Sequence, residues 1–246
     1  MYVWAELGVE GARRAAARGD VTVLVDALRS SVTITAALAA GARRVIPVRT
    51  VEEARAYLAR PGFRVAGERG GAQVPGFDYG NSPSQLLRHA EQIRDQTLIL
   101  TTSNGTPCIQ AAREGARALL VGSLPNAAAV TTTAFILAQA HGCDIALLAA
   151  GGDGRPAVED DLAVAALAAA LAARGAEADI PPPSIPAPAE STFRDGPNGR
   201  RLAELGYAED VALCARTDLF GVVGVLQGGE GFALGDPQQV GIASHE

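Results

Sequence analysis

The sequence contains no lysine. All 21 basic residues among its 246 residues are arginines. A chain without lysine has no Walker-type phosphate loop, no Schiff-base lysine and no lysine general base. Any cationic contact with a substrate must therefore come from an arginine, a metal ion or the start of a helix.

Cysteine, histidine and long apolar runs are also scarce. The three cysteines, Cys108, Cys143 and Cys214, are far apart, so we predict neither a disulfide framework nor a Cys-x-x-Cys metal site. The three histidines fit no metal-binding spacing. No apolar run reaches the roughly 20 residues that span a bilayer. No signal-peptide core follows Met1.

The net charge of −6 argues against a general nucleic-acid binder, which needs a basic face. We therefore expect a cytoplasmic protein that binds neither membranes nor nucleic acids. A homo-oligomer such as a dimer stays open as an alternative.

Short apolar runs alternate with helical patterns along most of the chain. Strands are predicted at 21–25, 44–48, 63–66, 97–101, 117–121 and 143–149. Helices are predicted at 30–40, 51–58, 81–93, 106–115, 125–141 and 158–174. This alternation predicts an α/β fold with a mostly parallel sheet covered by helices on both faces.

The C-terminal part follows a proline-rich stretch. Residues 180–189 carry five prolines and are predicted to form a stiff extended connection. The subregion 190–246 is expected to contain one or two helices over 199–214 and a hairpin from 222–226 and 232–234. We expect it to dock on the main sheet, so that residues 1–246 form a single domain.

The segment Thr101 to Thr106 is a candidate anion site. It follows the strand 97–101 and opens a helix, where free backbone N–H groups and the helix dipole favour negative charge. Small side chains let an anion approach the backbone closely. We predict phosphate contacts at Thr102, Asn104, Gly105 and Thr106; the alternative is a well-capped turn.

Carboxylates stand at several predicted loops or helix starts. Asp26 ends the strand 21–25, Glu68 lies beside Arg69 between glycines, and Glu159 and Asp160 open the helix at 158. Carboxylate oxygens at the carboxyl ends of strands are suited to Mg²⁺. The alternatives are an N-cap for Asp26, a surface turn for Glu68 and Arg69, and an acidic first turn that complements the helix dipole.

A glycine pattern at Gly152, Gly154 and Ala157 supports a different function. It formally matches a dinucleotide fingerprint, which would make the protein an oxidoreductase. The acidic turn that follows it would repel a pyrophosphate. A non-catalytic sensor that binds an anionic ligand is a further alternative.

Seven segments in order resemble the 2-phosphosulfolactate phosphatase family. They are 25–31, 66–71, 76–83, 101–106, 122–127, 159–160 and 209–211. Ser103 stands where the family pattern has threonine, and the loop 152–154 is a variant.

The resemblance implies an unusual α/β fold and Mg²⁺-dependent hydrolysis of 2-phosphosulfolactate, a small acidic phosphoester, to sulfolactate and phosphate. This reaction belongs to coenzyme M biosynthesis. The residues that the resemblance implies fall into three groups. The catalytic group is Asp26, Arg29, Glu68 and Arg69; the metal ligands come from Asp26, Glu68, Glu159 and Asp160; and further substrate contacts are Asn81, Ser82, Ser123 and Asn126. Covalent attack by a residue and direct attack by water both stay open.

Overall fold

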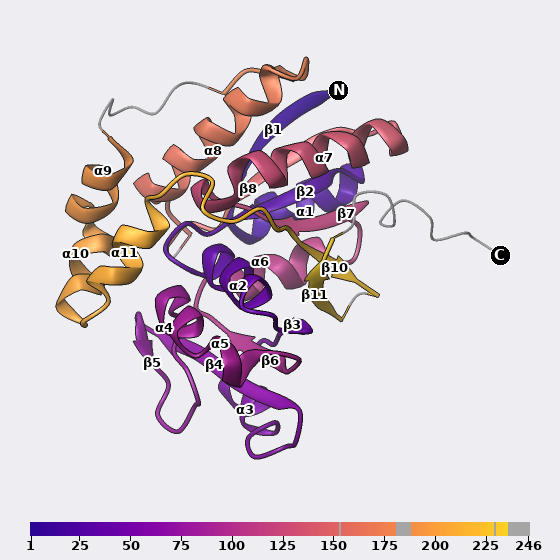
Figure 1. The fold of residues 1–246 in the computed structure, drawn as a ribbon. Coiled ribbons are helices and arrows are strands. Elements are labelled where there is room, and N and C mark those ends of the chain that lie inside the picture. Colours follow the sequence, from indigo (N-terminus) through magenta and orange to yellow (C-terminus); the bar gives the residue numbers. More distant parts are fainter. Residues whose placement is uncertain (153, 181–187, 229, 236–246) are drawn as a thin grey trace.

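The computed structural model describes residues 1–152, 154–180, 188–228 and 230–235 (Figure 1). Its strands are β1 (Tyr2–Leu7), β2 (Val21–Val25), β3 (Arg44–Pro47), β4 (Phe63–Arg69), β5 (Ala72–Gln73), β6 (Thr97–Thr101), β7 (Ala118–Val121), β8 (Ile145–Ala149), β9 (Glu177–Ala178), β10 (Gly224–Gln227) and β11 (Gly231–Leu234). Its α-helices are α1 (Gly8–Arg18), α2 (Ser30–Ala39), α3 (Val51–Arg55), α4 (Pro83–Arg88), α5 (Ala90–Ile93), α6 (Gly105–Ala112), α7 (Ala127–His141), α8 (Val158–Ala172), α9 (Ala189–Asp195), α10 (Pro197–Glu204) and α11 (Ala208–Cys214). A 3₁₀ turn, η1 (Leu124–Asn126), precedes α7.

The strands form one sheet in the order β5-β4-β6-β3-β11-β10-β7-β2-β8-β1-β9. One parallel group consists of β7, β2, β8, β1 and β9, and a second consists of β3, β6 and β4. The hairpin β10–β11 joins the groups by antiparallel pairing with β7 and β3. The predicted mostly parallel sheet is confirmed.

The residues that follow the carboxyl ends of β2 and β6 lie close together: a Cβ built on Gly105 would lie 2.8 Å from Asp26 Oδ2. Three antiparallel pairings separate the two parallel groups, so a flat sheet would place these ends on opposite edges. Five strand-to-strand steps lead from β2 to β6, and at the usual twist per step they rotate the strands by roughly 100°. This rotation turns the two strands away from the opposite directions that a flat sheet would give them.

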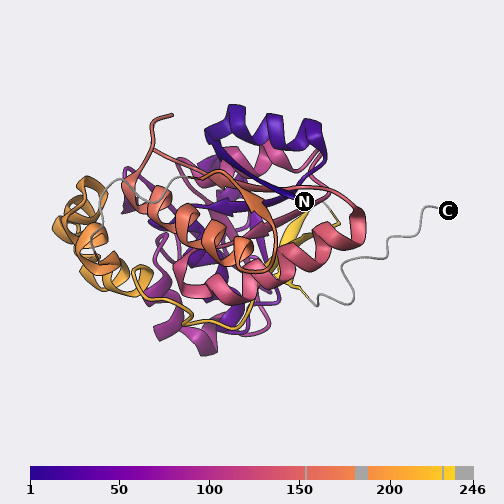
Figure 2. The same cartoon turned by 90° about the horizontal axis from the view of Figure 1, so that it is seen from above.

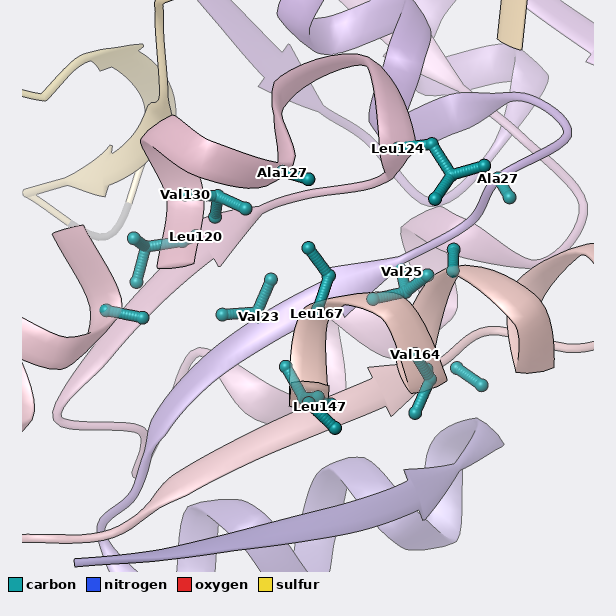
Figure 3. Close-up of a cluster of buried hydrophobic side chains, with 14 of the residues drawn as sticks. Val23, Val25, Ala27, Leu120, Leu124, Ala127, Val130, Leu147, Val164 and Leu167 are labelled. Atoms are coloured by element: carbon teal, nitrogen blue, oxygen red, sulfur yellow. The ribbon is translucent and has the colours of Figure 1, made fainter. Parts of the chain in front are cut away.

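Helices cover both faces of the sheet, as predicted. Val23 and Val25 of β2 face α7 and α8, where Leu167 packs in the same cluster (Figure 3). Leu24 points to the opposite face, where it joins Ile34 of α2. Alternate side chains of β2 thus pack into the two hydrophobic cores on opposite faces of the sheet, and the strand is buried throughout.

The C-terminal helices α9, α10 and α11 gather on one flank of the molecule (Figures 1 and 2). Phe193 and Val211 are buried in the core that includes β2, α7 and α8. The chain then runs across the molecule to β10 (Figure 1). Most of the predicted proline-rich connection lies outside the described residues. Among the described residues, no helix is both long and apolar enough to cross a membrane.

The structure differs from the sequence prediction in several places. The short strands β5 and β9 and the helix α9 were not predicted. β1 and α1 were not predicted, because β1 exposes Trp4 and lacks a clear apolar alternation. The predicted helix 81–93 is divided into α4 and α5, since His89 leaves the helical conformation at φ −107° and ψ 27°. The strand predicted at 63–66 continues to Arg69, so Glu68 and Arg69 lie on its end and not in a loop.

Candidate active site

A pocket of about 310 Å³ lies where the loops after β2, β4, β6 and β8 meet the helix α10. Its lining residues are Leu28, Arg29, Glu68, Gly70, Gly71, Asn81, Ser103, Asn104, Gly152, Asn198, Arg201 and Leu202. Four of the segments singled out from the sequence therefore converge here: 25–31, 66–71, 76–83 and 101–106. Their convergence at strand ends is typical of ligand sites in α/β folds.

Asp26 directly follows β2 and is held by the start of α2. Its carboxylate accepts hydrogen bonds from the backbone N–H of Ser30 at 3.1 Å and from the Ser30 hydroxyl at 2.6 Å. Its own N–H donates to Ser31 Oγ at 2.9 Å. Burial raises the pKa of Asp26, and the nearby charge of Glu68 raises it further. The carboxylate is thus fixed in an environment that favours a proton or a cation.

Asp160, in the first turn of α8, ties two loops together. One carboxylate oxygen accepts the N–H of Ala27 at 2.8 Å, and the other accepts the N–H of Gly151 at 2.9 Å. Burial and then the charge of Asp26 raise the pKa of Asp160 well above its ordinary value. Asp160 therefore lies close to Asp26.

Glu68 links the end of β4 to the turn after β6. Its two carboxylate oxygens accept N–H groups from Ser103 and Gly71, both at 2.7 Å. The neighbouring Arg69 is exposed and points elsewhere: its guanidinium donates to Thr101 Oγ1 at 3.0 Å and to the Glu68 carbonyl at 2.6 Å. Glu68 lines the pocket, and Arg69 does not.

Arg29 is a buried cation with a fixed partner. It is 2% exposed and pairs with Asp210 of α11 at 2.8 Å, and its Nη2 donates to the Gly71 carbonyl at 2.6 Å. The guanidinium carbon lies 4.2 Å from the ring centroid of Tyr207. These contacts hold its head group rigidly at the pocket wall.

The turn after β6 uses part of its hydrogen-bonding capacity internally. The N–H of Thr106 donates to Thr102 Oγ1 at 3.1 Å, and Thr106 Oγ1 donates to the Thr102 carbonyl at 2.8 Å. These two predicted phosphate contacts cap the start of α6. Asn104 lines the pocket. A Cβ built on Gly105 would lie 2.8 Å from Asp26 Oδ2, so the glycine lets this turn approach the Asp26 carboxylate.

The segment before α4 divides into two roles. Ser82 caps α4 by accepting the N–H of Gln85 at 3.2 Å, and its hydroxyl donates to Asp210 at 2.9 Å. Asn81 lines the pocket and is 4% exposed. Its amide oxygen is buried without a hydrogen-bond partner among the described residues. Buried polar groups are normally paired, so the Asn81 amide oxygen at the pocket can still accept a hydrogen bond.

Only four of the predicted site residues line the pocket, namely Arg29, Glu68, Asn81 and Asn104. Ser123, Asn126 and Glu159 are among those outside the lining. Asn126 accepts the N–H of Ser123 at 3.0 Å and donates to the carbonyls of Val121 and Val222, which fixes the turn before α7. Glu159 is buried and turns toward the α9–α10 junction, where Asn198 Nδ2 donates to it at 3.3 Å. Burial raises the pKa of Glu159.

The predicted carboxylates do not all gather at one point. In the described ranges, no three side chains of the His, Cys, Asp and Glu types come together as a metal site. Mg²⁺ usually takes only one or two carboxylates and keeps several waters. Asp26 and Glu68 each offer carboxylate oxygens, and a carboxylate that accepts a hydrogen bond retains lone pairs.

The comparisons with known proteins agree with this convergence of motifs. The family model described as 2-phosphosulpholactate phosphatase matches residues 9–229. The chain belongs to the 2-phosphosulfolactate phosphatase family.

Individual relatives cover most of the chain. A protein of Methanothermobacter thermautotrophicus named 2-phosphosulfolactate phosphatase is 38% identical, over 84% of this chain and 87% of its own length. Proteins named probable 2-phosphosulfolactate phosphatase are 35% identical in Carboxydothermus hydrogenoformans, over 84% and 86% of the two chains, and 32% identical in Deinococcus radiodurans, over 88% and 91%.

The dinucleotide alternative is not favoured by this family membership or by the loop after β8. In a dinucleotide site the N–H groups at this position would hold a pyrophosphate. Here the Gly151 N–H donates to Asp160, whose carboxylate would repel such a group. Gly152 lines the pocket described above.

Sequence reasoning missed the contribution of α10 and the role of Asp210. Asn198, Arg201 and Leu202 line the pocket, and Asp210 holds Arg29 from α11. A signal for α10 was present in Gly-Pro-Asn-Gly-Arg-Arg at 196–201, a run of small and polar residues at a helix start like the segments that were chosen. Nothing in the sequence placed it opposite the strand ends.

Proposed function

We propose that this protein is a Mg²⁺-dependent phosphatase that hydrolyses 2-phosphosulfolactate to sulfolactate and inorganic phosphate. Membership of the 2-phosphosulfolactate phosphatase family and the names of the relatives support the substrate. The observation that carries the proposal is one pocket where Glu68 and Arg29 meet, with the buried Asp26 beside it.

Hydrolysis breaks the bond between phosphorus and the ester oxygen. The oxygen of water joins phosphorus, and the ester oxygen becomes the hydroxyl group of sulfolactate. Asp26 and Glu68 would hold Mg²⁺, which when bound supplies positive charge to the phosphoryl oxygens.

The chain's own residues orient the phosphoryl group. Arg29 has donors beyond those used by Asp210 and Gly71, and its rigid fork suits phosphate oxygens. The start of α6 at Gly105 turns the positive end of a helix dipole to the same side. Asp160 holds the loops after β2 and β8 together, so that Asp26 keeps its position.

A phosphate-release assay tests the proposal. The substrates are 2-phosphosulfolactate, 2-phospholactate and a neutral alkyl phosphate, each with Mg²⁺ and with excess EDTA. We expect the highest kcat/KM for 2-phosphosulfolactate with Mg²⁺ and loss of activity in EDTA. Full activity in EDTA would contradict the metal assignment. Binding of the phosphoester without turnover would support the sensor alternative, and tight binding of NAD(P) would support the oxidoreductase.

A further inference from the structure

Arg201 is the second arginine of the pocket wall, and it differs from Arg29 in its partners. Arg29 is neutralised by Asp210, whereas the side chain of Arg201 has no ion pair or hydrogen bond within the described part of the chain. Its side chain is exposed at the rim. The charge that Arg201 brings to the pocket is therefore available to a ligand.

The turn between β4 and β5 is shaped to receive this arginine. Gly70 and Gly71 have φ of +61° and +88°, a conformation that other residues rarely adopt. A Cβ on Gly70 would lie 2.9 Å from Arg201 Nη2, and one on Gly71 would lie 3.3 Å from Leu202. The two glycines thus let α10 pack on the hairpin with the Arg201 head group against its backbone.

The neighbouring pocket residues add hydrogen-bonding capacity. Asn198, one turn before Arg201 on α10, lines the same pocket and is anchored by Glu159. Asn81 lines the pocket too. The buried atom of its side chain that lacks a partner among the described residues is the acceptor Oδ1, so only the N–H groups of this amide can contribute to an anion site. An amide offers two N–H donors, which complement an oxyanion beside a guanidinium.

We infer that Arg201, with Asn81, forms a second anion subsite that binds the non-phosphoryl oxyanion of the substrate. The inference rests on the proposed function. The chemistry is that of a sulfonate or a carboxylate, since each offers several acceptor oxygens to a planar guanidinium. Arg29 and the residues at the strand ends then bind the phosphoryl group, and Arg201 on α10 selects substrates whose other part carries an acidic group. Arg201 acts as a specificity-determining residue.

Substitution of Arg201 tests the subsite against a control on the same helix. For Arg201→Ala we expect kcat/KM on 2-phosphosulfolactate to fall by roughly 10- to 100-fold, the scale of one lost charged hydrogen-bond pair, with no change on a neutral alkyl phosphate. Arg200→Ala is the control, because Arg200 donates to the Asp195 carbonyl, away from the pocket. Equal effects of the two substitutions, or an unchanged preference for acidic substrates in Arg201→Ala, would overturn the subsite.

Two substrates distinguish the oxyanions. 2-Phospholactate keeps the carboxylate and lacks the sulfonate. If Arg201 binds the sulfonate, Arg201→Ala lowers kcat/KM for 2-phosphosulfolactate and leaves that for 2-phospholactate unchanged. If it binds the carboxylate, both fall by the same factor. Either result supports the subsite.

A binding measurement separates this inference from the proposed function. Calorimetry with sulfolactate needs no turnover. Suppose that the wild-type protein hydrolyses no phosphoester but binds sulfolactate, and that Arg201→Ala loses this binding while Arg200→Ala keeps it. This result would refute the phosphatase activity and support the subsite. If the wild-type protein hydrolyses 2-phosphosulfolactate and all three proteins bind sulfolactate with equal affinity, the phosphatase activity is supported and the subsite is refuted.

Discussion

The pocket has a floor and a wall that are built differently. We call three carboxylates the floor: Glu68 at the end of β4, which lines the pocket, and the buried Asp26 after β2 and Asp160 in the first turn of α8, which lie outside the lining. Every carboxylate oxygen of the three accepts a hydrogen bond, from a backbone N–H or from the Ser30 hydroxyl. The wall on α10 carries long side chains, and Arg201 there has no fixed partner in the described structure. A floor held by the backbone is suited to chemistry that needs fixed positions, whereas a wall of adjustable side chains is suited to selection of the substrate.

The largest expected effect comes from the buried ion pair between Arg29, in the loop after β2, and Asp210 of the C-terminal helix α11. Asp210→Ala leaves the buried Arg29 without its carboxylate and removes the acceptor of the Ser84 N–H. We expect the free energy of unfolding to fall by about 3–5 kcal/mol, as for other broken buried pairs. Urea denaturation followed by circular dichroism measures it.

The adjacent Glu209→Ala is the matched control. Glu209 pairs with Arg88 at an exposed position, where loss of an ion pair costs less than about 1 kcal/mol. Similar losses for the two variants would show that Arg29 does not depend on Asp210, and the floor and the C-terminal helices would then be independent.

The next effect concerns the floor alone. Asp26→Asn keeps the shape of the side chain and removes the charge, so turnover is expected to fall by roughly 100-fold or more. Because burial raises the pKa of Asp26, the ionised group costs stability, and the melting temperature should stay equal or rise. Phosphate release and thermal unfolding are measured on the same preparation. Asp161→Asn, exposed in the first turn of α8, should leave both unchanged.

A smaller effect tests how closely the floor is packed. Gly105→Ala places a Cβ against Ser30 and 2.8 Å from Asp26 Oδ2, so we expect a loss of about 1–3 kcal/mol together with reduced turnover. Gly152→Ala, whose Cβ meets nothing within 4 Å, is the control for stability. In a Ser30→Ala background the Gly105→Ala penalty should shrink. If Gly105→Ala lowers the free energy of unfolding by the same amount in that background, contact with the Ser30 hydroxyl is not the cause of the loss.

The smallest expected effect concerns Cys108, whose thiol should react only slowly with alkylating reagents in the folded protein. Burial raises the pKa of this thiol to about 12, so at pH 8 roughly one molecule in ten thousand carries the thiolate that alkylating reagents attack. We expect iodoacetamide to label Cys108 slowly in the folded protein and rapidly in urea, as measured by peptide mass spectrometry. Rapid labelling of the folded protein would show that α6 opens and that the floor is less rigid than the wall.

The sequence predicted the floor better than the wall, for a physical reason. Strand ends with small polar residues are recognisable locally, because a buried apolar run stops at a defined residue such as Val25 or Thr101. The sheet then brings such ends together. The wall depends on where α10 docks after a proline-rich stretch, and that docking is decided by packing of distant residues such as Phe193 and Leu202.

Some predicted site residues serve the fold as well as, or in place of, the ligand. Thr102 and Thr106 bond to each other, and Asn126 fixes a turn. A small polar residue at a strand end looks the same in sequence whether its partner is a ligand or the backbone. Only the position of the neighbouring N–H and C=O groups distinguishes the two cases.

The hairpin β10–β11 has a consequence for the order in which this protein can be completed during synthesis. It leaves the ribosome after β7 and β3, yet it lies between them in the sheet. Until residues 224–234 emerge, both of those strands keep a row of unpaired N–H and C=O groups on one side. A nascent chain therefore holds two half-sheets, each with an open edge that could pair with the wrong partner, and the final hairpin closes both edges at once.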